Sequence, residues 1–166
     1  MAWFELDHPD TQADKRARLA RLGISGEHVT FVPAEIGVAD VPAALAGAGH
    51  DATRPTVIVC EGLAPYLPPE VLAGLLTDLA ARAAAGSTLV LELPLVPRGD
   101  EDRARRARLR EAVSERGEPL HASVAADDIG TTLESSGWSV RRAMSPAGVP
   151  IGTSRSNVAF VLGHRS

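Results

Sequence analysis

Acidic side chains close the first apolar run of the chain. Residues 3–7 (WFELD) read as a short strand, Pro9 interrupts it, and residues 11–19 have the spacing of a helix. A carboxylate at the end of a strand, just before a helix, holds ribose hydroxyls in nucleotide-binding α/β sheets, because it accepts two hydrogen bonds from a diol. Asp7 is therefore the first candidate for a nucleotide-binding residue, and Glu5, on the same face of the strand, could share that role.

Two further acids stand at the ends of predicted strands. Glu35 follows the strand expected at 29–33, and Glu61 ends the strand expected at 56–61. Carboxyl ends of parallel strands meet at the edge where α/β sheets bind ligands. The run at 56–61 is apolar enough to be buried on both faces of a parallel sheet. We therefore expect Glu61 to be buried beside Cys60 and to need a partner, and we expect Gly62 to shape the backbone after it.

Each of these residues also has a purely structural interpretation. Asp7 could cap a helix or form an ion pair with Lys15 or Arg16, and Glu35 could cap the segment that follows it. His8 is a candidate for acid–base chemistry, because histidine exchanges protons near neutral pH. A surface helix cap is its alternative. The sequence alone leaves these alternatives open.

Strands and helices are expected to alternate along the whole chain. This order predicts one α/β domain over residues 1–166, with a mostly parallel sheet and helices on both faces. A solvated helix face is expected for the charged run 98–116, and a loop for 144–156. The strands are expected at 2–6, 29–33, 56–61, 87–93, 138–143 and 157–163, and the helices at 11–22, 41–48, 68–84, 100–117 and 126–136.

Four segments in this order resemble one family. Residues 4–12, 29–36, 56–67 and 85–92 are similar to the S-adenosylmethionine (SAM)-dependent methyltransferases related to leucine carboxyl methyltransferase, in particular their bacterial branch. The resemblance implies a class I methyltransferase-like (Rossmann-like) fold whose last strand is antiparallel. It also implies SAM as cofactor and O-methylation of a small molecule, in secondary metabolism.

The resemblance also assigns roles to particular residues. Asp7 would bind the ribose of SAM, Glu35 would accept the adenine amino group, and the Ile36 backbone N–H would meet a ring nitrogen. Glu61 and Gly62 would lie near the methionine end of SAM. Tyr66 would line the acceptor pocket, and its alternative is packing in the core.

The sequence departs from the family at one important place. The family opens with a helix, a strand and a glycine-rich turn, and no such turn precedes residue 3. Gly47 and Gly49 form the one Gly-x-Gly of the chain, and they follow an alanine-rich run, where glycine is better interpreted as a helix stop. We therefore expect an N-terminally truncated member of the fold that lacks its first, central strand.

A sheet without its central strand has to be completed. The absent strand would leave a gap of about 9–10 Å with bare backbone groups on both sides. Either the flanking strands pair directly, or another chain supplies the strand, or the protein is longer. We expect a homo-oligomer, most simply a dimer. Two further functions remain open: a SAM-independent cyclase or isomerase that reuses the cleft, and a non-catalytic binding subunit.

The composition of the chain limits the kinds of binding partner that are expected. The net charge of −4 and the pI near 5.7 argue against nucleic acid or an anionic membrane as the main partner. The single Cys60 is typical of a reducing cytoplasm. No apolar run reaches the roughly 20 residues of a membrane span. The five histidines are scattered and predict no metal site: His8, His28, His50, His121 and His164.

Overall fold

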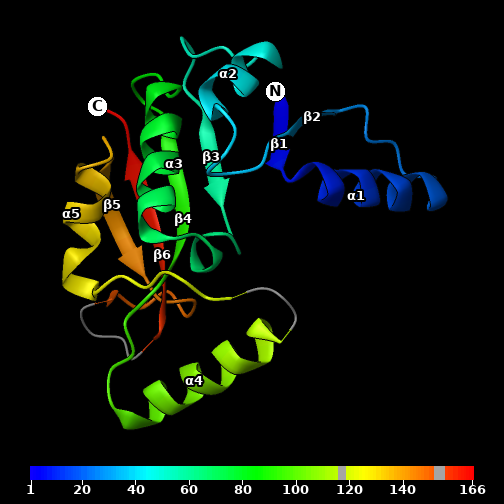
Figure 1. Ribbon diagram of the computed structural model, residues 1–166. Helices are drawn as coiled ribbons and strands as arrows, with labels where there is room; N and C mark the ends of the chain where they lie inside the picture. The colour runs from blue at the N-terminus through cyan, green and yellow to red at the C-terminus, as the bar shows by residue number, and fades with distance from the viewer. Residues whose placement is uncertain (116–118, 152–155) are drawn as a thin grey trace. The chain divides into compact units, whose positions relative to one another are not determined.

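The chain divides into two compact units. A computed structural model describes residues 1–115, 119–151 and 156–166 (Figure 1). We call Met1–Thr53 the N-terminal unit and Arg54–Ser166 the C-terminal unit. The order of strands and helices along the chain follows the α/β alternation expected from the sequence.

The N-terminal unit is built on two parallel strands. Strand β1 (Trp3–Asp7) pairs with β2 (Val29–Pro33), and Asp7 lies opposite Pro33 in the register. Helix α1 (Pro9–Arg21) connects them, and α2 (Val41–Gly47) follows β2. Pro9 opens α1 because its fixed φ suits the first turn. All four predicted elements are confirmed, with boundaries shifted by at most two residues.

A buried amide anchors α1 to both strands. Gln12 is the one buried residue of this otherwise polar helix, with 3% of its surface exposed. Its Nε2 donates hydrogen bonds to the carbonyl oxygens of Glu5 (2.7 Å) and Val32 (3.4 Å). These bonds hold the start of the helix against the sheet, which places the end of β1 beside the first turn of α1.

The C-terminal unit contains a mixed four-stranded sheet in the order β3-β4-β6-β5. Strands β3 and β4 are parallel, whereas β6 runs antiparallel to both β4 and β5, as the resemblance implied. The strands are β3 (Val57–Cys60), β4 (Thr88–Pro94), β5 (Ser139–Met144) and β6 (Val158–His164), and the helices are η1 (Ala64–Tyr66), α3 (Pro69–Ala81), α4 (Asp100–Ser114), η2 (Ala126–Asp128) and α5 (Ile129–Glu134).

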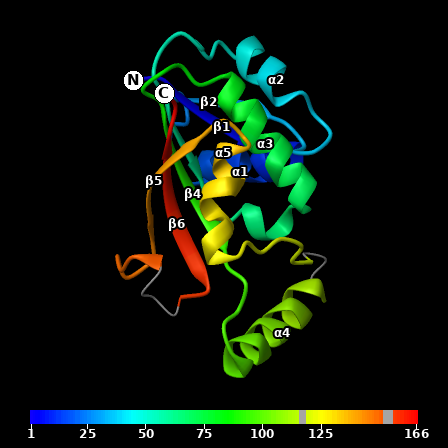
Figure 2. The same cartoon turned by 90° about the vertical axis from the view of Figure 1, so that its left-hand side faces the viewer.

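One face of this sheet forms the core. Helices α3 and α5 lie on the same side of the sheet (Figure 2). Leu89, Leu91 and Leu93 of β4 are at most 1% exposed on that side. The fully buried Trp138 precedes β5, and its Nε1 donates a 2.9 Å hydrogen bond to the Leu76 carbonyl of α3. A large apolar side chain with a satisfied polar atom therefore ties α3 to the sheet.

The opposite face is open at β3. Val57 and Val59 are 70% and 62% exposed, so the expectation that this strand is buried on both faces is wrong. Ile58 and Cys60 point to the covered side, where Cys60 is buried. Among the described residues of this unit, these two side chains are therefore not covered by a helix.

Two strands flank the place of the missing central strand. Each within its own unit, β1 pairs with β2 and β3 pairs with β4. The expected completion of the sheet stays a prediction.

The charged run forms a largely solvated helix, on which the half-buried Arg106 donates a 2.8 Å hydrogen bond to the Ala122 carbonyl. Helix α4 has no buried residue, and Arg103 forms an ion pair with Asp100 one turn earlier. The expected solvated helix is confirmed for Asp100–Ser114, and the expected helix end at 117 lies outside the described residues. Within the described part of the chain, no helix is both long and apolar enough to cross a membrane.

Removal of the Trp138 side chain should destabilise the C-terminal unit strongly. Trp138→Ala leaves a cavity and removes the hydrogen bond to the Leu76 carbonyl, so we expect a loss of about 3–5 kcal/mol in the free energy of unfolding, measured by urea titration followed by circular dichroism. Leu109→Ala on α4, where the side chain is 52% exposed, is the control and should change this free energy by less than about 0.5 kcal/mol. Equal effects of the two substitutions would contradict the described core.

Candidate functional site

Asp7 lies at the carboxyl end of β1, where the sequence predicts a ligand-binding carboxylate. It is half-buried, and its Oδ1 accepts a hydrogen bond from the His8 backbone N–H (2.7 Å). Neither expected ion pair is seen, because Lys15 pairs with Glu5 and the Arg16 guanidinium lies 5.4 Å from the centre of the Phe31 ring. Among the described residues no partner of the second carboxylate oxygen is seen, and ribose binding by Asp7 stays a prediction.

Glu5 has a structural partner. Its Oε2 forms an ion pair with the Lys15 ammonium of α1, and the Glu5 side chain is 25% exposed. The other oxygen, Oε1, is buried without a hydrogen-bond partner among the described residues. Glu5 therefore helps to fix α1 on the strand. Its expected share in ribose binding remains a prediction.

Glu35 lies at the same edge of the N-terminal sheet as Asp7. The Asp7 carbonyl accepts a hydrogen bond from the Ala34 N–H (2.9 Å), so the two strand ends stay together. The Glu35 side chain is exposed and Ile36 is half-buried. The cap of α2 is Asp40, whose Oδ1 accepts from the Ala43 N–H (2.9 Å). The Glu35 backbone carbonyl accepts from the N–H groups of Val38 (3.1 Å) and Ala39 (2.8 Å), and adenine binding by its side chain stays a prediction.

His8 is a helix cap. It occupies the N-cap position of α1, where its Nδ1 accepts a hydrogen bond from the Asp10 N–H (3.2 Å). The capping alternative is thus confirmed, and the acid–base role of His8 stays a prediction.

The turn after β3 is held by a residue that the sequence did not single out. Gly62 has φ of +66°, and its N–H donates a 2.9 Å hydrogen bond to Glu92 Oε2 of β4. The backbone-shaping role of Gly62 is confirmed. Glu61 is exposed, so its expected burial is wrong: β3 ends at Cys60, and the chain leaves the sheet before the carboxylate.

Tyr66 ends the short helix η1 and is 38% exposed. Core packing, its structural alternative, is therefore wrong. The adjacent Pro65 carbonyl accepts backbone hydrogen bonds from His121 (2.8 Å) and Ala122 (3.4 Å), which secures this turn of chain. The phenol remains accessible, as the expected role in acceptor binding requires.

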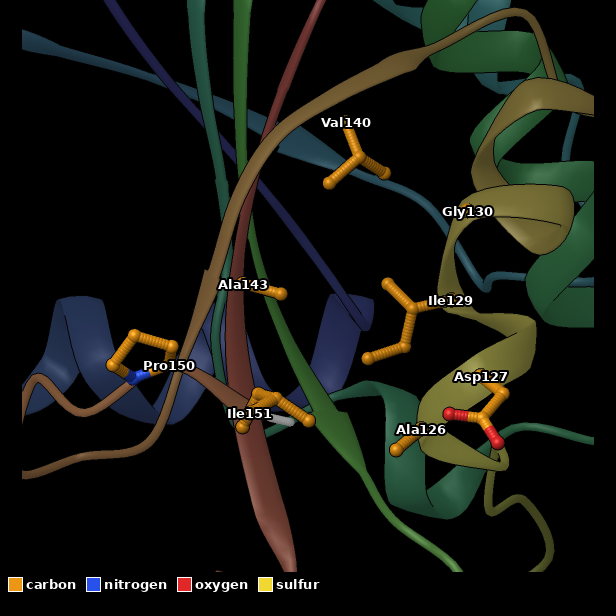
Figure 3. A pocket seen from close by; sticks show the side chains of 8 residues that line it. All are labelled: Ala126, Asp127, Ile129, Gly130, Val140, Ala143, Pro150 and Ile151. Atoms are coloured by element: carbon orange, nitrogen blue, oxygen red, sulfur yellow. The ribbon is translucent and has the colours of Figure 1, made fainter. Parts of the chain in front are cut away.

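A pocket of about 310 Å³ lies between β5 and the segment η2–α5, in the C-terminal unit. Figure 3 shows Ile129, Val140 and Ile151 around it, with Asp127 at one side. The size is at the lower end of that of small-molecule sites, and the lining is mainly apolar. None of the residues expected from the sequence lines this pocket. The described residues contain no group of three or more His, Cys, Asp or Glu side chains that could hold a metal ion.

Comparison with solved structures defines the class of fold. The chain aligns over 99% of its length with an S-adenosylmethionine-dependent methyltransferase, SibL, at 19% identity and a TM-score of 0.65. It aligns over its full length with the mitomycin 7-O-methyltransferase MmcR, at 16% identity and a TM-score of 0.65. It covers 43% and 42% of these two chains. The fold is that of the class I SAM-dependent methyltransferases.

Sequence comparison identifies the family. Residues 1–80 match the family described as leucine carboxyl methyltransferase. A protein of Mycolicibacterium gilvum, whose name places it among the S-adenosyl-L-methionine-dependent methyltransferases, is 42% identical over 116 residues, which are 69% of this chain and 37% of that protein. The chain belongs to the SAM-dependent methyltransferase family related to leucine carboxyl methyltransferase. It spans about a third of the length of the curated relatives it matches.

Glu92 should hold the Gly62 turn in place. Glu92→Ala removes the acceptor for the Gly62 N–H, so we expect the exchange of this amide with deuterium to accelerate by about tenfold, measured by NMR. Glu70→Ala, at an exposed site in the first turn of α3, is the control and should leave Gly62 unchanged. An unchanged Gly62 exchange rate in Glu92→Ala would contradict a positioning role.

The Cys60 thiol should be unreactive in the folded protein, and its ionisation in alkali should lower the free energy of unfolding. Burial raises the pKa of this thiol from 9.0 to about 11. The unfolded chain loses the thiol proton first, so this contribution to stability is complete below pH 9 and disappears as the pH rises to about 11, by at most about 3 kcal/mol. Denaturant titrations from pH 8 to 11 measure this effect, and Cys60→Ala should remove the corresponding slope. Rapid alkylation of the folded protein at pH 8 would contradict the burial.

Proposed function

We propose that the chain forms part of a SAM-dependent O-methyltransferase that acts on a small molecule, and that its N-terminal unit binds the nucleoside end of SAM. One observation carries this proposal. Asp7 and Glu35 follow two adjacent parallel strands, at their carboxyl ends, with side chains that no helix cap or ion pair of the described residues engages. Family membership and the class of fold support methyl transfer as the reaction.

The donor set fits the nucleoside part of SAM. A half-buried carboxylate with one oxygen already held by the His8 N–H presents its other oxygen in a fixed orientation, which suits a pair of ribose hydroxyls. Glu35 would accept from the adenine amino group. The half-buried Ile36 would cover one face of the base.

The chemistry requires few residues of this chain to move protons. The sulfonium of SAM supplies an activated methyl group, and catalysis consists mainly of aligning an acceptor atom with that group. Glu61, on a turn held by Gly62 and Glu92, would offer a fixed negative charge, and the accessible Tyr66 would contact the acceptor. A firmly held turn preserves such an alignment.

The pocket near Ile129 favours a small, mainly apolar ligand. This observation does not depend on SAM, because none of the predicted cofactor residues lines the pocket. It therefore also agrees with the second candidate function, a SAM-independent enzyme or a binding subunit for a small molecule. Calorimetry with S-adenosylhomocysteine separates the two candidates, since only the methyltransferase requires binding at the N-terminal unit.

Loss of the Asp7 carboxylate should weaken cofactor binding. We expect Asp7→Ala to reduce the affinity for S-adenosylhomocysteine by about 1–3 kcal/mol, because a charged acceptor of ribose hydrogen bonds is lost. Glu35→Ala should have a smaller effect, since the backbone also contributes to adenine recognition. Isothermal titration calorimetry measures the dissociation constants of the parent protein and of the two variants.

The control removes the same charge elsewhere in the unit. Glu27 lies exposed in the turn before β2, and Glu27→Ala should leave the affinity unchanged. If Asp7→Ala and the parent bind equally well, the assigned ribose site is wrong. If the parent releases no heat at millimolar ligand, the chain alone does not bind the cofactor.

A further inference from the structure

We propose that the pocket between β5 and the segment η2–α5 binds a small ligand that consists of an apolar ring and an ammonium group. The ring lies against Ile129, Val140 and Ile151, and the ammonium group pairs with the Asp127 carboxylate (Figure 3). The pocket is formed wholly within the C-terminal unit, and none of the predicted cofactor residues lines it. This second site is therefore separate from the proposed SAM site, and its ligand does not depend on methyl transfer.

A bulge in β5 shapes the first wall of the pocket. Val140 and Arg142 pair with neighbouring residues of β6, so Arg141 is an extra residue in β5. In a regular strand, residues three positions apart lie on opposite faces. Val140 and Ala143 nevertheless both line the pocket, whereas Arg141 and Arg142 are exposed and do not line it. The bulge thus keeps two apolar side chains on the pocket face, and bulges that re-aim side chains in this way are frequent next to active sites.

The second wall is the turn that follows β5. The Ser145 N–H donates a hydrogen bond to the Val149 carbonyl (2.8 Å), and the Val149 N–H donates to Ser145 Oγ (3.2 Å). An antiparallel bridge joins Met144 to Pro150. These contacts bring Pro150 and Ile151 to the pocket, where Ile151 is 5% exposed. The wall is therefore held by hydrogen bonds of its own, as in a pocket that is formed before its ligand binds.

The third wall, from η2 and α5, combines apolar surface with a charge. Ile129 is 3% exposed and faces the side of β5 that bears Val140 (Figure 3). Asp127 lies at the edge of the pocket and is exposed. No hydrogen bond or ion pair of the described residues engages its carboxylate. A free carboxylate beside an apolar surface favours a cation that carries an apolar group, because ring burial and charge pairing then occur together.

The size and the surroundings of the pocket narrow the class of ligand. A volume of about 310 Å³ is at the lower end for small-molecule sites and suits one ring with a short chain. Exposed Asp128 follows Asp127 in η2, and the arginines of β5 lie outside the lining, so an anionic ligand is disfavoured. The ligand is therefore a small aryl-alkyl amine in its protonated form.

Titration of the full chain with phenethylamine tests the charge of the ligand, with the amide NMR shifts of Ile129, Gly130 and Val140 as the readout. This amine is protonated at neutral pH. Phenethyl alcohol has the same ring and chain without the charge, and it is the matched probe. We expect both probes to shift these amides, and the amine to bind about threefold more tightly. Asp127→Asn should remove this difference and leave the affinity for the alcohol unchanged.

A variant that fills the pocket tests its location. Gly130 of α5 lines the pocket, and a Cβ at this position has open space within 4 Å, so a larger side chain can enter without displacing the backbone. Gly130→Leu should weaken the binding of both probes at least about tenfold. Gly74→Leu is the matched control, because Gly74 of α3 has the same open space and does not line the pocket.

Three results would overturn the proposal: no saturable shift of the pocket amides with phenethylamine, equal affinity of the parent for the amine and the alcohol, or equal binding by Gly130→Leu and Gly74→Leu. If Gly130→Leu does not fold, the comparison of the parent with Asp127→Asn, a change at an exposed position, still decides the question. Calorimetry with S-adenosylhomocysteine reports on the other site, so a failure of the proposed function and a failure of this proposal are distinguished.

Discussion

The C-terminal unit depends on the burial of one face of β4. Its leucines at 89, 91 and 93 alternate with half-buried residues, and they form the surface on which α3 and α5 pack. Strand β4 also has a hydrogen-bonded neighbour on each side, β3 and β6, so its backbone groups are paired as burial requires. The same pairing fixes the position of Glu92, whose carboxylate reaches the Gly62 N–H. The geometry of the Gly62 turn is thus a consequence of the core of this unit.

The elements of the fold could be predicted from local signals. Alternating and continuous apolar runs identified all six strands, and caps, prolines and glycines located the helices to within a few residues. Gly49, with φ of +90°, ends the segment after α2, as expected of a helix stop rather than a cofactor loop. These signals act over a few residues, and therefore a single sequence contains them.

The environments of individual side chains were harder to predict. The apolar run of β3 indicated a strand with two buried faces, but burial depends on which elements cover each face, and Val57 and Val59 have no such cover in their unit. The contact between Glu92 and Gly62 joins residues 30 positions apart, through the register of β3 and β4. The pairing of Lys15 with Glu5, and not with Asp7, follows from how Gln12 seats α1 on the strands. Such contacts require the tertiary arrangement.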